Sequence, residues 1–270
     1  MKFWLVDAFT SQPFAGNPAG VCVVGEFPSD STMQKIAGEL HWSQTAFVKP
    51  IADHHFHIRW FSPKDEAPIC GHATLASAHI LWKKQHTASD TIWFESLAGP
   101  LVAKRGEDEA ITLDFPSKPI VECTLSNHMR DVLGDVRVEA AYRDSLIEVV
   151  VLADASELMS LTPRLDLLQK LPCRALSVTA PGPDGYDFCS RYFAPKVGIP
   201  EDPVCGSSHC RLAPYWADRL GKNYLKAYQA SPRSGVVHCH VRESRVDLTG
   251  HAVIVCEGFF PNYQLELGSQ

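Results

Sequence analysis

Pro68-Ile69-Cys70-Gly71-His72 and Pro203-Val204-Cys205-Gly206-Ser207 are two copies of one short phrase, about half a chain apart. Each copy follows an aromatic segment that ends in a proline-lysine step, Pro63-Lys64 in the first and Pro195-Lys196 in the second. Each also opens an apolar run with helical spacing. A repeat of this kind predicts two similar domains, each with one cysteine at the N-terminus of a central helix.

Length, charge and composition narrow the class of protein. The 270 residues suit two domains of ordinary size, and a net charge of −6 without a long Lys/Arg run argues against nucleic acid or a membrane surface as partner. Nine cysteines in no regular spacing favour a reducing compartment, so we expect a cytoplasmic protein. Neither G-x-G-x-x-G nor G-x-x-x-x-G-K-[ST] occurs, which argues against a nucleotide cofactor.

The order of predicted elements is many strands around one apolar helix, twice over. The helices are expected from Cys70 to about Lys84 and from Cys205 to about Leu220. Near the N-terminus, strands are expected at 3–9 and 20–24, joined by a turn at Gly16-Asn17-Pro18. This order differs from the regular strand–helix alternation of a doubly wound sheet.

The two Cys-Gly phrases have a chemical meaning if they begin helices. A helix N-terminus leaves backbone N–H groups unpaired and carries partial positive charge, so it binds a carboxylate and favours a thiolate. Glycine after the cysteine lets a ligand approach the backbone closely. The plainer interpretation is that small residues pack a tight strand-to-helix corner, and both remain open at this point.

Six short motifs follow one another from the first strand to the last: Val6-Asp7-Ala8-Phe9, Phe14-x-Gly16-Asn17-Pro18, Ser43-x-Thr45, Phe61-x-Pro63, Gly71-His72-Ala73-Thr74-Leu75 and Glu201-Asp202-Pro203-Val204-x-Gly206-Ser207. Together they resemble those of the PhzF-like family, named for phenazine biosynthesis. The resemblance implies an α+β fold of the diaminopimelate epimerase type: two pseudo-symmetric domains, each a mixed β-barrel around a central helix, with the active site between them. It also implies no metal, no organic cofactor and commonly a homodimer.

The domain boundary is expected near Phe115-Pro116-Ser117-Lys118-Pro119, the segment with the strongest linker character. This places the N-terminal domain at residues 1–116 and the C-terminal domain at 119–270. This assignment leaves open that the last strand of the chain crosses back to the first domain.

The chain departs from the family at the residue that carries the proton. The family has a glutamate there, in a Ser-Glu-Thr step, whereas this chain has Gln44. An amide cannot accept and return a proton at accessible pKa values. The resemblance implies that His72 and Asp202 relay a proton or hold a substrate amine. The predicted substrate-binding residues are Ser43, Gly71, Gly206 and Ser207.

A second departure concerns the cysteines. The family position before Gly206 is usually threonine, and this chain has Cys205 there and Cys70 at the matching place. Cysteines at both places are similar to proline racemase and diaminopimelate epimerase, in which one acts as thiolate base and the other as thiol acid. The alternative is that Cys205 is a small replacement for threonine.

Three functions remain after these observations. The first is a cofactor-independent isomerase that moves a proton on a small carboxylate, with Gln44, His72, Asp202, Cys70 and Cys205 as candidate catalytic residues. The second is a two-cysteine racemase or epimerase. The third is a binding protein that has lost the base, which the amide in place of the glutamate favours.

Overall fold

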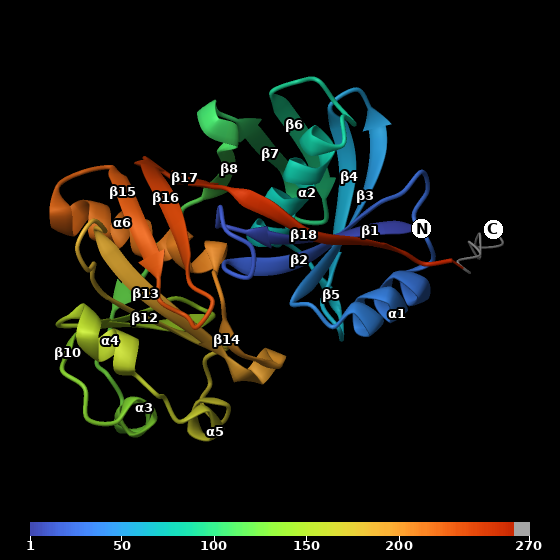
Figure 1. Ribbon diagram of the computed structural model, residues 1–270. Coiled ribbons are helices and arrows are strands. Elements are labelled where there is room, and N and C mark those ends of the chain that lie inside the picture. The colour runs from blue at the N-terminus through green and yellow to red at the C-terminus, as the bar shows by residue number, and fades with distance from the viewer. Residues whose placement is uncertain (262–270) are drawn as a thin grey trace. The chain divides into compact units, whose positions relative to one another are not determined.

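The computed structural model describes residues 1–261 and forms two compact units (Figure 1). Unit 1 consists of Met1–Asp114 together with the chain from Thr249 onward, and unit 2 of Phe115–Leu248. The chain therefore leaves unit 1 and returns to it, so its last strand belongs with its first ones. In the described part of the chain, no helix has both the length and the apolar character needed to cross a membrane.

Unit 1 is of mixed α+β type. Its elements in chain order are β1 (Lys2–Ala8), β2 (Asn17–Val23), α1 (Asp30–Leu40), β3 (Gln44–Ala52), β4 (His55–Phe61), β5 (Glu66–Ala67), α2 (Gly71–Lys83), β6 (Thr91–Ser96), β7 (Gly99–Arg105), the 3-10 turn η1 (Glu107–Glu109), β8 (Ile111–Pro116) and β18 (Ala252–Phe259). The strands pair in the order β18, β1, β2, β3, β4, β6, β7 and β8, with β5 beside β4. Of these pairs of described strands, β2–β3 and β4–β6 are parallel and the others antiparallel.

Unit 2 is built in the same way. Its elements are β9 (Val121–Glu122), α3 (Asn127–Leu133), β10 (Val138–Arg143), β11 (Ile147–Leu152), α4 (Ala155–Ser160), α5 (Leu165–Leu168), β12 (Ala175–Pro181), β13 (Phe188–Ala194), the 3-10 turn η2 (Pro195–Val197), β14 (Ile199–Asp202), α6 (Gly206–Leu220), β15 (Tyr224–Gln229), β16 (Gly235–Arg242) and β17 (Arg245–Gly250). The strands pair in the order β9, β10, β11, β12, β13, β15 and β16, with β14 beside β13. Again two pairs are parallel, β11–β12 and β13–β15.

The two pairing orders are the same at every matching step. In unit 1, β2 is parallel to β3, β3 antiparallel to β4, and β4 parallel to β6. In unit 2, β11 is parallel to β12, β12 antiparallel to β13, and β13 parallel to β15. The central helices α2 and α6 each follow a short strand, β5 or β14, that pairs with the third strand of its set, β4 or β13. The two Cys-Gly phrases thus occupy the same place in the same topology.

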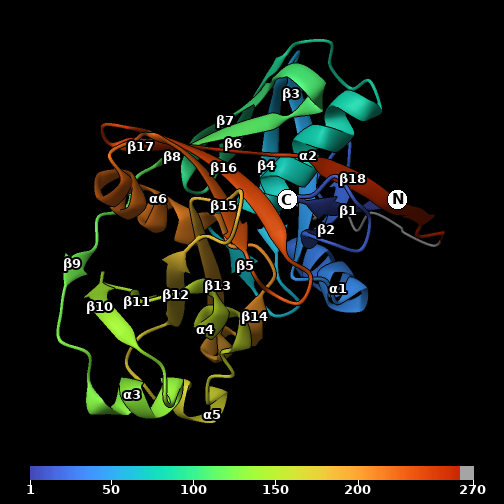
Figure 2. The same cartoon turned by 60° about the vertical axis from the view of Figure 1, so that its left-hand side comes forward.

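The central helix of unit 1 is buried on all sides because strands surround it, as Figure 2 shows. α2 contacts β1, β2, β3, β7 and β18, and every residue from His72 to Trp82 is buried. A helix that is hydrophobic all round has to be covered in this way. Burial of each large aliphatic side chain, such as Leu75 or Leu81, contributes about 1.5–3 kcal/mol. The helix start is therefore held in a fixed position.

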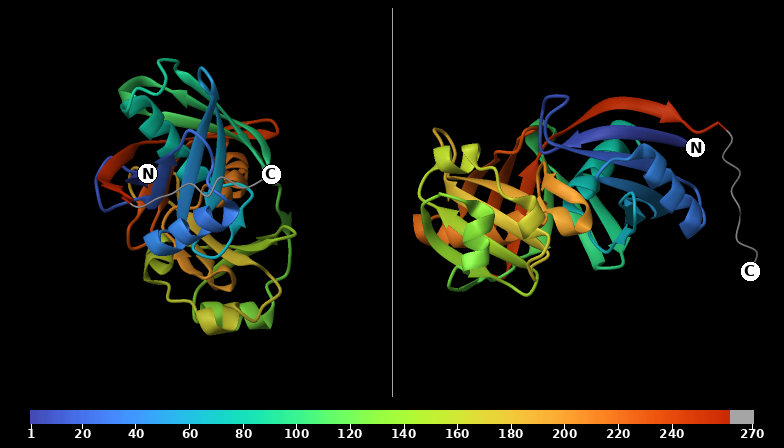
Figure 3. Two further views of the ribbon diagram at one scale, coloured as in Figure 1. Left: turned by 90° about the vertical axis from the view of Figure 1, so that its right-hand side faces the viewer. Right: turned by 90° about the horizontal axis from the view of Figure 1, so that it is seen from below.

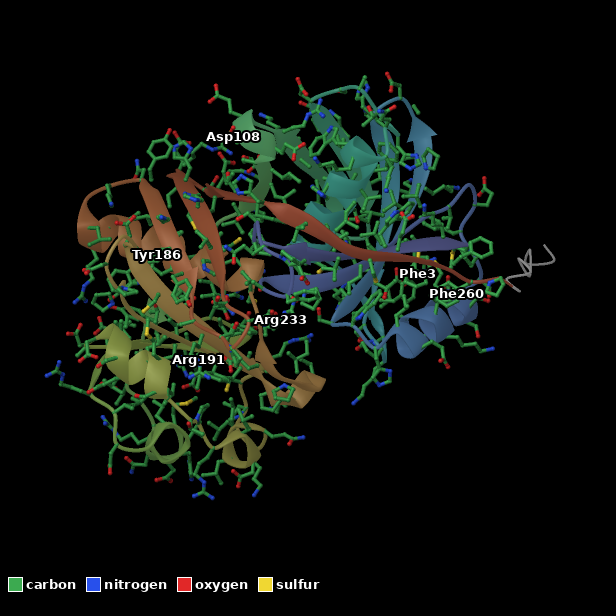
Figure 4. All side chains as sticks on the ribbon, viewed as in Figure 1. Phe3, Asp108, Tyr186, Arg191, Arg233 and Phe260 are labelled. Carbon is green, nitrogen blue, oxygen red and sulfur yellow. The ribbon has the colours of Figure 1, made fainter. Side chains whose placement is uncertain are left out.

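The last strand closes unit 1 against the first one. β18 pairs antiparallel with β1 over its whole length, as the views in Figure 3 show. Beyond the strand, the Phe260 N–H donates to the Met1 carbonyl over 2.9 Å. The Phe260 ring lies 5.0 Å from that of Phe3, beside which it is labelled in Figure 4.

The predicted turn at Gly16-Asn17-Pro18 is wrong at its last two residues. β2 begins at Asn17, which pairs with Ala8, and Pro18 pairs with Asp7. Pro18 is tolerated in the strand because the pairing of β2 with β3 starts only at Ala19. The reversal lies earlier, where positive φ angles occur at Phe9, Phe14 and Gly16.

Candidate functional site

The first predicted site residues gather at the start of α2. Cys70 is the N-cap, in extended backbone, and its carbonyl accepts from the Thr74 N–H over 3.2 Å and from the Thr74 hydroxyl over 2.5 Å. Within residues 1–261, no acceptor pairs with the backbone N–H groups of Gly71 and His72. Two donors and the positive end of the helix dipole are therefore available for an anion.

His72 lies at the centre of a small polar cluster. Its Nδ1 is 3.2 Å from the Asn17 amide nitrogen and 3.5 Å from the Cys70 sulfur. Its Nε2 is 3.2 Å from the Ser43 hydroxyl, which donates to the Asn17 amide oxygen over 3.1 Å or to the Pro18 carbonyl over 2.9 Å. We call Asn17, Ser43, Cys70, Gly71 and His72 the α2 site.

Burial keeps the His72 imidazole neutral. It lowers the pKa of His72 from 6.5 to about 3, because the cation cannot be hydrated there. At neutral pH the ring therefore has one N–H donor and one acceptor nitrogen. The sequence predicted His72 as a site residue, but its protonation state follows only from the packing around it.

Gln44 is the first residue of β3, on the strand face opposite α1. Side chains alternate along a strand, and Phe47 packs in the hydrophobic cluster that includes Met33 and Ile36 of α1. Gln44 and Ala46 therefore point to the other face, and α2 also contacts β3. The Gln44 Oε1 atom is buried and has no hydrogen-bond partner within the described residues. A buried carbonyl oxygen left unpaired costs about 1–3 kcal/mol, so this atom is suited to a donor from a ligand.

The second group of predicted residues lies at the start of α6, and we call Asp202, Cys205, Gly206 and Ser207 the α6 site. Cys205 is the N-cap, and its sulfur is 3.4 Å from the Ser207 hydroxyl. The Asp202 carboxylate accepts from the Val204 N–H over 3.2 Å. As at α2, the N–H groups of Gly206 and Ser207 have no acceptor in the part of the chain that the structure describes.

Burial works against a thiolate at Cys205, although its place at a helix N-terminus favours one. Burial raises the pKa of this thiol to about 12, the negative charge of Asp202 raises it further, and the hydrogen bond from Ser207 lowers it only in part. Loss of hydration outweighs the attraction of the helix N-terminus for the thiolate. Cys205 is therefore a thiol at neutral pH, which suits a proton donor or a packing residue.

Several supporting residues lack a sequence signal because their partners are distant in the chain. Gln229 of β15 accepts from the Cys205 N–H over 2.8 Å and donates to the Asp202 carbonyl over 2.6 Å. Arg211 donates to the Ser207 carbonyl over 2.8 Å and pairs with the Asp144 carboxylate. These contacts fix the α6 turn.

Among the described residues, no three His, Cys, Asp or Glu side chains are grouped so as to hold a metal ion.

Three buried imidazoles predict a loss of stability in acid. Burial lowers the pKa of His72 to about 3 and those of His79 and His209 to about 4. The folded state then favours the neutral rings, so their contribution is complete above pH 6.5 and is lost as the pH falls towards 4. One pKa unit is about 1.4 kcal/mol. We expect the free energy of unfolding, measured with urea, to fall by several kcal/mol, as an order of magnitude, between pH 7 and pH 4.

Replacing one of these rings separates their effect from that of the carboxylates, which also titrate in acid. His79→Gln is expected to flatten the pH dependence between 6.5 and 4, whereas His128→Gln, at an exposed position of α3, leaves it unchanged. Identical slopes for His79→Gln and the unchanged protein would refute this assignment.

Comparison with known proteins places the whole chain in one group. Residues 6–258 match the family described as phenazine biosynthesis-like protein. An uncharacterized isomerase of Halalkalibacterium halodurans is 44% identical over 258 residues, covering 93% of this chain and 95% of that protein. Another, from Pseudomonas aeruginosa, is 42% identical and covers 96% and 98%. These names agree with the isomerase class predicted from the sequence.

Solved structures agree at the level of the fold. A PhzF-family protein of Enterococcus faecalis superposes with a TM-score of 0.90 at 39% identity, covering 95% of this chain and 97% of that one. A probable proline racemase of Agrobacterium radiobacter superposes with a TM-score of 0.64 at 10% identity, covering 98% and 94%. The mixed α+β fold and its relation to the racemase type, both predicted from motifs, are thereby confirmed.

Proposed function

Because the chain belongs to the phenazine biosynthesis-like protein family, we propose that it is a cofactor-independent isomerase that moves a proton on a small carboxylate. The observation that carries the proposal is the matching form of the two helix starts. Each has a buried cysteine as N-cap, a glycine after it, and two backbone N–H groups without an acceptor within residues 1–261. This arrangement suits an anion at neutral pH.

The proposed reaction needs a base that is ionised before substrate binds. Asp202 is the one carboxylic acid among the five predicted catalytic residues, since Gln44 is an amide and Cys205 a thiol. We assign it the proton: a C–H bond next to the substrate carboxylate breaks, its electron pair stays on the substrate as an enolate-like anion, and the proton moves to the Asp202 carboxylate. Asp202 then returns a proton to the same or a nearby carbon, which restores the enzyme.

His72 stabilises the charge that develops on the substrate in this scheme. A neutral imidazole donates an N–H hydrogen bond without transferring its proton. A donor that is fixed in place stabilises the transition state by about 3–4 kcal/mol. The contacts of the ring with Asn17 and Ser43 support this role, because they hold the donor before the substrate arrives.

Gln44 binds substrate in this proposal. Its buried and unpaired Oε1 atom accepts a hydrogen bond from a substrate amine or hydroxyl. In other members of the family, the glutamate at this position would offer a carboxylate oxygen to the same group. The preferred substrate is therefore a small amino or hydroxy acid. The residues Ser43, Gly71, Gly206 and Ser207 remain predicted substrate-binding residues.

A racemase with Cys70 and Cys205 as acid and base is the second candidate. The similarity of the fold to a probable proline racemase and the two cysteine N-caps favour it. The raised pKa of Cys205 restricts it, because this thiol then suits only the acid of the pair and Cys70 would have to be the thiolate base. The third candidate, a binding protein without catalysis, rests on Gln44 alone.

Other expectations from the sequence stay predictions. They are the barrel form of each domain, the domain limits 1–116 and 119–270, the homodimer and the cytoplasmic location.

Incubation of the protein with a panel of amino and hydroxy acids in D2O tests the proposed function. We expect deuterium at the carbon next to the carboxylate, or at a carbon conjugated with it, in at least one acid of the panel. Mass spectrometry and proton NMR measure the incorporation, with heat-denatured protein as control. Saturable binding without any incorporation would instead identify a binding protein.

A further inference from the structure

The Ser43 hydroxyl indicates which nitrogen of His72 carries hydrogen. It has one proton, and two of its three neighbours, the Pro18 carbonyl at 2.9 Å and the Asn17 amide oxygen at 3.1 Å, can only accept. The geometry favours giving the proton to one of these two, since a bare Nε2 would leave three acceptors around one proton. The hydroxyl oxygen then has to accept from the third neighbour, His72 Nε2 at 3.2 Å. Nε2 therefore carries the hydrogen.

The second ring nitrogen meets a donor, which completes the pattern. Nδ1 lies 3.2 Å from the Asn17 Nδ2 atom, and an amide nitrogen only donates. It also lies 3.5 Å from the Cys70 sulfur, whose S–H is a weak donor. The Cys70 sulfur lies 3.9 Å from Nε2 as well and does not distinguish the two nitrogens. The neutral ring has one bare nitrogen, and the contacts with Ser43 and Asn17 identify it as Nδ1.

Asn17 is held rigidly enough to impose this choice. It is fully buried, and its backbone pairs with Ala8 of β1. The loop before it is held by Asp7, whose carboxylate accepts from the Phe14 N–H over 2.7 Å. The loop then turns at Gly16, where φ is +64°. The backbone of Asn17 is therefore fixed by the β1–β2 reversal, and from there its amide reaches both His72 and Ser43.

We propose that Asn17 is a positioning residue that holds His72 as the neutral tautomer with hydrogen on Nε2. This inference rests on the proposed function for its purpose, since there the Nε2–H, which donates to Ser43 in the protein alone, turns to the developing negative charge once substrate is bound. It is independent of that function for its test, because the tautomer is observable without substrate. The hydrogen bonds to Asn17 and Ser43 take the place that an acidic partner of a histidine usually has.

Nitrogen NMR of the protein labelled with ¹⁵N-histidine tests the proposal. In the unchanged protein at pH 7 we expect His72 Nδ1 to have the shift of a bare nitrogen and Nε2 that of a protonated one. The spectrum of His72→Gln assigns the signals. In Asn17→Asp, which keeps the shape but replaces the donor by an acceptor, Nδ1 should become protonated.

Two further variants separate the role of Asn17 from a general effect. Ser43→Ala should leave Nδ1 bare, because the amide still donates to it. Asn127→Asp, which makes the same exchange at an exposed position of α3, should leave the spectrum of His72 unchanged. Hydrogen on Nδ1 in the unchanged protein, or a bare Nδ1 in Asn17→Asp, would overturn the proposal. If the tautomer is as expected but no substrate exchanges deuterium, the proposed function fails and this inference stands.

Discussion

His72→Ala is expected to lower the rate of deuterium incorporation by about 10²–10³-fold at saturating substrate. The loss is that of one fixed donor to the developing charge, which is of this size in other enzymes that stabilise an oxyanion. Substrate binding should weaken much less, because the backbone N–H groups at the start of α2 remain. The measurement is the initial rate of incorporation by mass spectrometry over a range of substrate concentrations.

His79→Ala is the matched control for this prediction. His79 lies on the same helix two turns later, is also buried, and also has its pKa lowered by burial. The same substitution there creates a comparable cavity away from the α2 site. Equal losses of activity in the two variants would mean that His72 acts only through the packing of the helix.

Gly16→Ala is expected to destabilise the protein more than the same substitution at Gly99, Gly134, Gly185 or Gly221, which also have positive φ. A left-handed backbone costs alanine about 1–2 kcal/mol. At Gly16 the added Cβ would also lie 2.2 Å from the Ala8 carbonyl oxygen and 2.7 Å from a Thr10 methyl carbon. The Ala8 atom belongs to the backbone of β1, so the strands have to shift. We expect a total loss of about 3 kcal/mol or more in urea unfolding.

Gly221→Ala provides the comparison. Its φ of +65° matches the +64° of Gly16, but no atom lies within 4 Å of the added Cβ. It should cost only the backbone strain, about 1–2 kcal/mol. Because Asn17 follows Gly16 directly, Gly16→Ala should also change the ¹⁵N shifts of His72, whereas Gly221→Ala should not. Equal losses of stability in the two variants would show that the close approach to Ala8 is relieved at no cost.

Local pattern was enough to predict the helix starts but not the chemistry at them. Cys70 and Cys205 are N-caps as expected, because a small residue followed by glycine and an apolar run is a local signal. The protonation state of Cys205 could not be predicted from the sequence, since it depends on how deeply the tertiary fold buries the sulfur. The spacing of residues along the chain does not indicate how deeply a side chain will be buried.

The supporting residues show the same limit. Asn17 belonged to a recognised motif, yet its contact with His72 spans 55 positions of the chain. Gln229 reaches Cys205 across 24 positions and had no motif at all. Such pairs exist only once the strands are assembled, so a single sequence cannot indicate them. At Pro18 the local signal was misleading: it predicted a turn, but the residue lies in a strand because β1 pairs with β2 there.

The proposed reaction depends on Asp202 as the group that carries the proton, with Cys205 as a neutral thiol. The decisive experiment is deuterium incorporation by Asp202→Asn, measured beside Cys70→Ser and Cys205→Ser with the same acid. We expect a loss of about 10²-fold or more in Asp202→Asn and retention of at least about a tenth of the rate in each serine variant, since a hydroxyl takes the place of the sulfur while the Asp202 carboxylate remains. Incorporation that survives in Asp202→Asn but disappears in either serine variant would contradict the account and identify a two-cysteine racemase.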